Sequence, residues 1–460
     1  MSNYPGSIHN HSEYSNLRLR DSINRVKDML EYAGELGHEI IGFTEHETVA
    51  NALKIEREYA KIKTKYPNLK VIRGNEIYLC RNGLSWDNFQ KGIDQYFHFC
   101  LYAVDSLGHE QIREISTRAW MRSYMTGKMR RVPTYYADLE DIIKKNPGHV
   151  IGTTACLGGF LGSIIMAMDA TQNKDYEVVI ERWLNKMLGI FGKDYFYLEM
   201  QPSASKEQTL VNGKILELSR KYNIPYIITT DSHYLKKEDA PIHSAFLRSQ
   251  DGDREVDSFY ATTYMMGTEE LESHITNLEK LDFEYAYDNI RKIKNMCSDY
   301  SLAKPLNIPS LSWKEPSRTY SLGEYNSYFD KMPYLKTFYE SDFAGDRRMV
   351  DLIIDKIESD SRLQNIETYN ELNSNLETTW VSSEVNKAHW SAYFLNLQKI
   401  LDVCWEAGTL VGPGRGSGVG FLLLYILDII QINPMWETTK THAWRLTDRF
   451  KGLLSMATYL

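Results

Sequence analysis

The sequence has no long hydrophobic run. Even the apolar stretch from Phe421 to Ile432 contains Asp428 and Gln431, whereas a membrane-spanning helix needs about 20 apolar residues in succession. The N-terminus, MSNYPGSIHNHSEY, lacks the basic and apolar regions of a secretory signal. We therefore expect a cytoplasmic protein with no membrane partner.

Cysteine is scarce, and no two cysteines form a CxxC pair. The five are an odd number and widely spaced, as expected for free thiols in a reducing compartment: Cys80, Cys100, Cys156, Cys297 and Cys404. A functional cysteine would then act as a metal ligand or a nucleophile.

An excess of positive charge is also missing. The formal net charge is −8, which argues against a chain that coats nucleic acid by bulk charge. Acidic metal ligands add negative charge that cations later offset, so the balance also suits a metallonuclease. At 460 residues the chain is long enough for about two to four domains.

Short apolar runs alternate with helical patterns over the first half of the chain. Candidate strands are residues 40–44, 71–74, 97–104, 149–154, 195–200 and 226–230, and amphipathic helical stretches include 23–36 and 210–222. This order predicts an α/β fold, either a parallel barrel or a doubly wound sheet. The nearly continuous apolar strands indicate burial on both faces of the sheet.

After about residue 251 the pattern changes to long charged helices, for example 288–297 and 351–361. Residues 304–309, KPLNIP, are typical of a connector. Further on, the glycine-rich loop 411–418 leads into an apolar helical run, 419–430. We expect one domain over 1–255 and a second, mostly helical region over 256–460.

Metal-ligand side chains gather near the N-terminus and at the ends of the predicted strands. The spacing of His9 and His11 on an extended segment puts both imidazoles on one side. The carboxyl ends of barrel strands converge on one rim. Five further side chains of ligand type follow predicted strand segments: His46, Glu76, Cys156, Asp231 and His233.

These residues lie in motifs that together resemble the PHP (polymerase and histidinol phosphatase) domain of the C-family DNA polymerase III alpha subunit. The motifs are HNHSEYS at 9–15, TEH at 44–46, GNEIY at 74–78, His98 in an apolar run, ACLGG at 155–159 and TDSHYL at 230–235. The resemblance implies a distorted (βα)7 barrel over 1–255, followed by part of a polymerase palm and thumb region.

The resemblance also implies a cluster of up to three divalent ions. The family's nine ligand positions fall on His9, His11, Asp21, His46, Glu76, His98, Cys156, Asp231 and His233. Asp28 is the alternative to Asp21, because the spacing after the histidine pair differs from the usual one by a few residues. Imidazoles and a thiolate favour zinc, and the carboxylates would also accept manganese or magnesium.

Active relatives of this kind are proofreading 3′ to 5′ exonucleases, so the implied partner is DNA, as a single strand or a primer 3′ end. Two close metal ions suit phosphodiester hydrolysis without a protein nucleophile. Two alternatives stay open: a phosphomonoesterase of the histidinol phosphatase type, and a non-enzymatic scaffold that completes a split polymerase with the remaining half on another chain.

The glycine-rich loop is similar to a palm motif of the same polymerase family. The resemblance places nucleotide contact on Arg415, Gly416 and Ser417, since exposed backbone N–H groups and a guanidinium bind phosphate. A tight turn before a helix explains the glycines equally well. A second patch, 118–136, mixes cations with aromatic rings, as a single-strand channel does, although a solvated helical face and loop is an equal alternative.

The sequence departs from the polymerase pattern after this loop. The landmark that precedes the paired catalytic aspartates is replaced by AWRLTDRF at 443–450, and Asp428 and Asp448 stand alone. Polymerisation needs two metal ions held between carboxylates. We therefore expect no polymerase activity from this chain alone.

The measurement is primer extension with all four deoxynucleoside triphosphates and magnesium, on protein free of host polymerase. The expected result is no extension. Extension that is lost on mutation of Asp428 or Asp448 would contradict this reading of the carboxylates.

Overall fold

The chain folds into two compact units, Met1–Ala303 and Lys304–Leu460. The computed structural model describes residues 3–435 except 19, 92, 128, 204, 250–257, 310 and 312–321. Within these ranges, no helix is both long and apolar enough to cross a membrane. Each unit is described by itself below.

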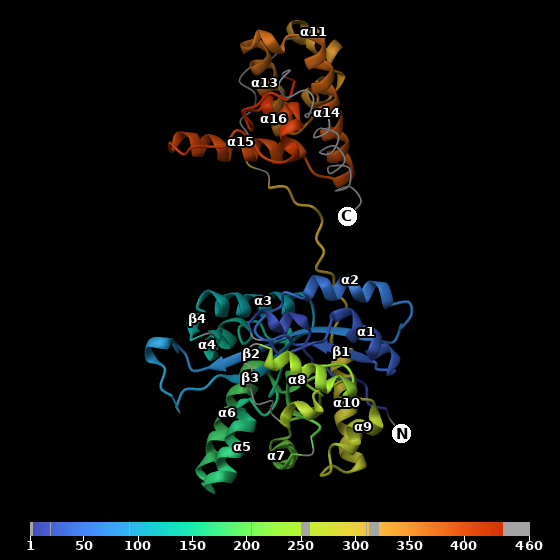
Figure 1. Ribbon diagram of the computed structural model, residues 1–460, viewed down its shortest axis with the longest axis vertical. Coiled ribbons are helices and arrows are strands. Elements are labelled where there is room, and N and C mark those ends of the chain that lie inside the picture. The colour runs from blue at the N-terminus through green and yellow to red at the C-terminus, as the bar shows by residue number, and fades with distance from the viewer. Residues whose placement is uncertain are drawn as a thin grey trace. The chain divides into compact units, whose positions relative to one another are not determined.

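A seven-stranded sheet forms the centre of the first unit (Figure 1). Its order is β1-β2-β3-β7-β8-β9, with β6 paired to β2, and a separate β4–β5 hairpin is added. The strands are β1 (Ile40–Phe43), β2 (Lys70–Cys80), β3 (Phe97–Ala103), β4 (Tyr124–Thr126), β5 (Met129–Arg131), β6 (Pro133–Tyr135), β7 (Val150–Thr153), β8 (Phe196–Met200) and β9 (Tyr226–Ile228). The expected mixed α/β class is confirmed.

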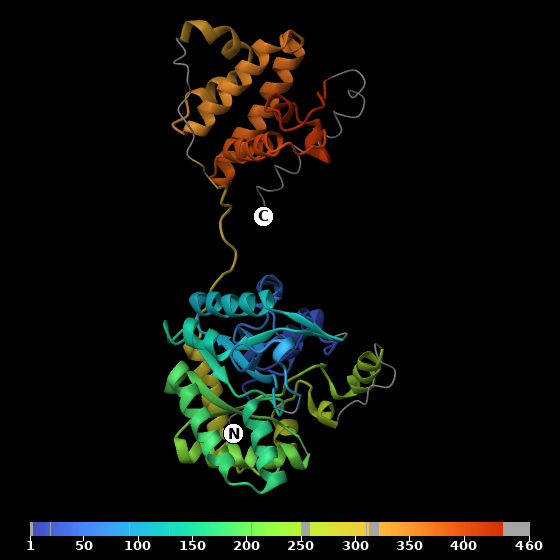
Figure 2. The ribbon, with the colours of Figure 1, turned by 90° about the vertical axis from the view of Figure 1, so that its left-hand side faces the viewer.

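Helices cover both sides of this sheet. Figures 1 and 2 show α2 and α3 on one side and α5, α6 and α7 on the other. The helices of this unit are α1 (Val26–Glu35), α2 (Ala52–Ile62), α3 (Ser106–Met121), α4 (Tyr136–Ile142), α5 (Phe160–Thr171), α6 (Asp175–Phe191), α7 (Lys206–Tyr222), α8 (Ala240–Arg248), α9 (Thr268–Ser273) and α10 (Lys280–Met296). Two-sided cover explains why most residues of the sheet are buried.

The unit continues past the expected boundary at residue 255, because α10 packs on β9. The Tyr226 hydroxyl donates to the Asp282 carbonyl at 2.9 Å, and the Asn289 amide donates to the Tyr226 carbonyl at 2.9 Å. The expected connector, 304–309, begins where the compact unit ends.

One strand runs against the prediction of a parallel sheet. β3 is antiparallel to both neighbours, β2 and β7, while the other pairs in the sheet are parallel. The reason is local: residues 81–96 join β2 to β3 as a hairpin, and strands joined in this way pair antiparallel. The N-terminal end of β3, with His98, therefore lies beside the carboxyl ends of the parallel strands.

The N-terminal segment closes the sheet between β1 and β9. Backbone N–H groups of Ile40, Gly42 and Thr44 donate to carbonyls in residues 5–10 at 2.9–3.1 Å. On the other side, the His11 N–H donates to the Ser232 carbonyl at 2.9 Å. The segment that carries the histidine pair is thereby fixed at the rim.

The described part of the second unit is helical and has no strand. Its helices are α11 (Leu322–Lys331), α12 (Pro333–Tyr339), α13 (Ala344–Ser359), α14 (Ile366–Asn386), α15 (Trp390–Glu406) and α16 (Leu422–Ile426). The helix expected over 419–430 is shorter: a 3-10 turn, Ser417–Gly420, precedes α16. After α16 the backbone turns at Asp428, whose φ is +55°.

Gly42 lies where the N-terminal segment passes close to β1. A Cβ atom there would lie 2.0 Å from the Ile8 carbonyl oxygen. We expect Gly42→Ala to destabilise the fold by about 1–3 kcal/mol, as overpacking does, and to lower metal content by displacing His9 and His11. Thermal unfolding and metal analysis are the measurements.

Gly189→Ala is the matched control. Gly189 lies in α6 with no atom near the added Cβ, and alanine is favoured in helices by up to about 1 kcal/mol. Equal stability and metal content in the two variants would contradict the assigned role of Gly42.

Candidate metal centre

The histidine pair and Asp231 form the first group of ligands. The Nε2 atoms of His9 and His11 lie 3.3 Å apart, and each lies within 3.2 Å of the same Asp231 oxygen, Oδ1. The two imidazoles come from the closing segment and Asp231 follows β9. The expected convergence at the rim is present.

Glu76 belongs to a second group, which also contains His98 and Cys156. One of its oxygens is 2.9 Å from His98 Nδ1, and the other is 2.7 Å from His46 Nδ1. The Cys156 sulfur is 3.3 Å from the same His98 nitrogen. His98 reaches this place only because β3 runs in the reverse direction.

Asp21 forms a third group with His46 and His233. Its Oδ2 atom lies 2.7 Å from His46 Nε2 and 2.9 Å from His233 Nε2, and its Oδ1 accepts from the Tyr260 hydroxyl at 2.7 Å. Asp28, the alternative, is exposed on α1. The structure thus brings Asp21, and not Asp28, to the other eight residues.

These contacts create overlapping sets of atoms that could hold a metal ion, each with ligand atoms within 4.8 Å of one another. The sets are His9, His11 and Asp231; Glu76, His98 and Cys156; His11, His46 and His233; and His9, Glu76 and Cys100. The last includes a cysteine that the sequence analysis did not select.

Several buried ligand atoms point at one another without forming hydrogen bonds. Among the described residues, His46 Nδ1, Glu76 Oε2 and Asp231 Oδ1 are buried and have no hydrogen-bond partner, although the first two are only 2.7 Å apart. Leaving such atoms unsatisfied is costly. A divalent cation between them would satisfy their lone pairs, so the residues present fit a metal.

Burial and the neighbouring carboxylates set the ionisation of the cluster. Burial lowers the pKa of His11 to about 3, which keeps this imidazole in the neutral form that binds metals. Burial alone would lower the pKa of His46, but Glu76 and Asp21 together raise it to about 10. Burial also raises the pKa of the Cys156 thiol. A bound cation would displace the protons that these pKa values retain.

Two buried carboxylates that the sequence analysis missed hold the histidine pair in place. Glu199 Oε1 lies 2.6 Å from His9 Nδ1, and Ser15 links His11 Nδ1, at 2.9 Å, to Glu45, at 2.6 Å. Each contact directs the opposite ring nitrogen, Nε2, into the centre. The available signal was an acidic residue inside an apolar strand for Glu199, and the TEH motif for Glu45.

The rim backbone is strained next to the ligands. Glu47, Ala155 and Asp231 have φ of +57°, +56° and +47°, a left-handed conformation that costs non-glycine residues about 1 kcal/mol or more. Glu47 follows His46, and Ala155 precedes Cys156. These turns orient ligands where the strands end.

The glycine-rich loop belongs to the second unit and is mostly exposed. Arg415 and Gly416 are exposed and Ser417 is half-buried, and Gly416 has φ +85°, which requires glycine. Asp428 pairs with Lys356 at 2.5 Å. Asp448 and the segment 443–450 lie outside the described residues.

The basic patch at 118–136 is partly committed to internal ion pairs. Arg118 lies 2.9 Å from Glu114 and 2.8 Å from Asp141, and Arg122 pairs with Asp138 at 2.5 Å. The patch available to a ligand is therefore smaller than the sequence suggested.

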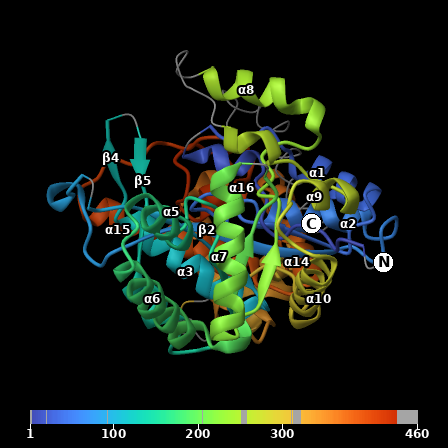
Figure 3. The ribbon, with the colours of Figure 1, turned by 90° about the horizontal axis from the view of Figure 1, so that it is seen from below.

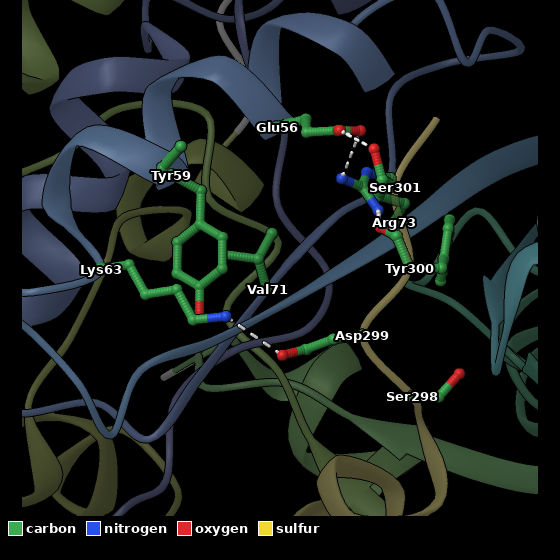
Figure 4. Close-up of a pocket in the computed structure, with 10 residues that line it drawn as sticks. Glu56, Tyr59, Lys63, Val71, Arg73, Ser298, Asp299, Tyr300 and Ser301 are labelled. Carbon is green, nitrogen blue, oxygen red and sulfur yellow. Dashed lines mark hydrogen bonds and ion pairs between the residues drawn. The ribbon is translucent and has the colours of Figure 1, made fainter. Parts of the chain in front are cut away.

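A pocket of about 310 Å³ lies between α2 and residues 298–301 (Figure 4). Its charges are paired, Lys63 with Asp299 at 3.2 Å and Arg73 with Glu56 at 3.4 Å. None of the nine candidate ligands lines it, so the chemistry belongs to the rim and not to this pocket.

Family comparison agrees with the motifs. The model of the PHP domain matches residues 7–203. This chain contains a PHP domain. The model of the bacterial DNA polymerase III alpha NTPase domain matches residues 357–453, so the resemblance to DNA polymerase III alpha is confirmed in both units.

Curated relatives extend the similarity across most of the chain. It is 33% identical over 448 residues to "Probable DNA polymerase YorL" of Bacillus subtilis (strain 168) and to "DNA-directed DNA polymerase" of Bacillus phage SPbeta, in both cases covering 93% of this chain and 34% of the relative. It is 26% identical over 468 residues to "DNA polymerase III subunit alpha" of Thermus aquaticus, covering 93% and 36%. The chain spans about a third of the length of these relatives.

Among solved structures, a protein described as a "putative metal-dependent phosphoesterase" of Bifidobacterium adolescentis matches this chain with a TM-score of 0.32 and 11% identity. The match covers 64% of this chain and 96% of that one.

We expect Glu199→Gln to weaken metal binding about 10- to 100-fold, as the loss of a partner behind a metal-binding histidine does. The change keeps the shape of the side chain and removes the charge beside His9 Nδ1. Competition against a fluorescent zinc chelator measures the effect.

Glu207→Gln is the control, since Glu207 is exposed on α7. Wild-type metal affinity in Glu199→Gln, with Glu207→Gln also unchanged, would show that Glu199 does not support the metal centre.

Proposed function

We propose that this PHP domain hydrolyses DNA phosphodiester bonds in a metal-dependent reaction, as a 3′ to 5′ exonuclease. The observation that carries the proposal is the convergence of distant segments on one site: eight of the nine expected ligands fall into overlapping metal-ligand sets, and the ninth, Asp21, contacts two of them, His46 and His233. A closed structural zinc site needs only about four ligands, and this cluster has more.

The nine residues would share the work of holding the ions. His9, His11 and Asp231 would hold one ion, His98 and Cys156 a second, and Asp21, His46 and His233 a third. Glu76 lies within 3.5 Å of four of the imidazoles, so its carboxylate would help to hold the ions.

Divalent ions so held would supply an activated water and would stabilise charge on the attacked phosphate and the leaving oxygen. The protein's own contribution is to fix the positions of the ligands and to limit the access of water to the site. Eight of the nine side chains are at most 8% exposed, and His98 is 23% exposed. The substrate phosphate would therefore approach at His98.

Zinc is the proposed resident metal, because imidazoles and a thiolate predominate, and manganese or magnesium would substitute. DNA is the proposed substrate because the relatives are named as DNA polymerases. We further propose that Arg415, Gly416 and Ser417 contact a nucleotide phosphate, and that another chain could complete a split polymerase.

Two alternatives have defined tests. A phosphomonoesterase would hydrolyse p-nitrophenyl phosphate faster than a labelled single strand. A scaffold without activity would contain no metal after purification and would bind none on titration with zinc.

The exonuclease test uses a 5′-labelled single strand with manganese or zinc, on which stepwise shortening is expected and excess EDTA abolishes it. Asp21→Asn and Asp231→Asn should each reduce the rate by more than the roughly 10- to 100-fold typical of losing a residue behind a ligand, because each of the two is itself a proposed ligand. Circular dichroism checks that the variants are folded.

Asp28→Asn is the matched control for Asp21→Asn, since it makes the same change at an exposed site a few residues away. We expect it to keep wild-type turnover. Full activity in EDTA, or a folded Asp21→Asn variant with unchanged turnover, would contradict the metal-dependent mechanism.

A further inference from the structure

Three aromatic rings form a row on the hairpin that joins β2 to β3. The ring centroids of Trp86 and Phe89 are 6.4 Å apart with planes at 16°, and those of Phe89 and Tyr96 are 6.1 Å apart with planes at 8°. Trp86 is 56% exposed, and Phe89 and Tyr96 are half-buried. Nearly parallel, accessible rings on a loop contribute little to a hydrophobic core. Their faces are instead available for stacking.

Cations lie beside this row. The Arg131 guanidinium lies over the Tyr96 ring, 5.1 Å from its centroid, and the Tyr96 hydroxyl contacts the Tyr124 hydroxyl on β4. Within the described ranges, Arg130 donates to the Ser123 hydroxyl at 3.0 Å, and neither arginine forms an ion pair. Figures 1 and 3 show the hairpin (light blue) and β4–β5 on the same side of the unit.

We call Trp86, Phe89, Tyr96, Arg130 and Arg131 the aromatic strip. Its inner end reaches the metal centre by two routes. Tyr96 directly precedes β3, and His98, the most exposed candidate ligand, lies two residues further on.

The second route runs through Arg18. This guanidinium donates to the Arg130 carbonyl at 3.5 Å and lies 4.2 Å from the centroid of the Tyr78 ring. The Tyr78 ring is in turn 4.5 Å from that of His98. The strip therefore begins where the metal centre opens to solvent.

We propose that the aromatic strip binds single-stranded DNA, with bases stacked on the rings and phosphates on the two arginines, and directs the strand to the opening at His98. The delivery of a 3′ end rests on the proposed exonuclease function, whereas binding by the strip does not. Unpaired cations beside exposed rings suit a single strand, because a single strand offers both phosphates and free base faces. A duplex hides its base faces.

The test measures binding of the full chain to a labelled oligothymidine of about 12 nucleotides, by fluorescence anisotropy. Phosphorothioate linkages at the 3′ end slow hydrolysis, so binding is read separately from chemistry. Trp86→Ala should weaken binding about 5- to 150-fold, the range for the loss of one stacked base.

Arg131→Gln and Arg130→Gln should each weaken binding and also flatten the dependence of log affinity on log salt by about 0.7, the value for one phosphate contact on a single strand. Trp86→Ala should leave this slope unchanged. This difference in salt slope between the arginine variants and Trp86→Ala separates charge from stacking. A general loss of structure would not produce such a difference.

Matched controls lie elsewhere on the same unit. Tyr285 is 46% exposed on α10, and Arg57 is exposed on α2. Tyr285→Ala and Arg57→Gln should keep wild-type affinity and salt slope.

Wild-type affinity and slope in the strip variants would overturn the proposal, as would tighter binding of duplex DNA or of oligouridine than of oligothymidine. Photocrosslinking with 4-thiothymidine gives a second readout: crosslinks at Trp86, Phe89 or Tyr96 support the strip, and crosslinks confined to other regions overturn it. Intact binding without hydrolysis of an unmodified strand would contradict the exonuclease alone.

Discussion

The concentration of buried carboxylates and imidazoles at one rim is the constraint on which the first unit depends. Glu76 is fully buried and contacts imidazoles from the N-terminal segment, from the end of β1 and from β3. Buried charges of this kind are stable only when they are paired or bind a cation. A divalent cation held among these groups would balance the buried carboxylates, so the proposed metal would serve stability as well as catalysis.

The backbone arrangement follows from that need. The closing segment carries His9 and His11 into place, and the reversed strand β3 carries His98. Left-handed backbone at Glu47, Ala155 and Asp231 orients side chains at strand ends. Behind the ligands, Glu199 and Glu45 fix the imidazoles. A cation held here would stabilise the assembled site and offset the cost of the strain and of the buried acids.

The reversed strand also links the metal centre to the molecular surface. The hairpin that makes β3 antiparallel carries the aromatic strip, and its last ring, Tyr96, lies beside the opening at His98. One loop thus accounts for a ligand position, for access to the centre and for a stacking surface. In the proposed function, this loop would hold a DNA strand outside the rim while one phosphate enters the metal centre.

The sequence by itself determined the α/β class, the positions of six strands along the chain and most of the candidate ligands, because apolar periodicity and polar residues at strand ends are local features. It could not decide between Asp21 and Asp28, or show that β3 is reversed, or find Glu199. Strand direction depends on pairing between distant segments, and a buried acid is recognised only by its neighbours. The tertiary structure also separated the arginines bound in internal ion pairs, such as Arg118 and Arg122, from Arg130 and Arg131, because only spatial proximity shows which charges are already neutralised.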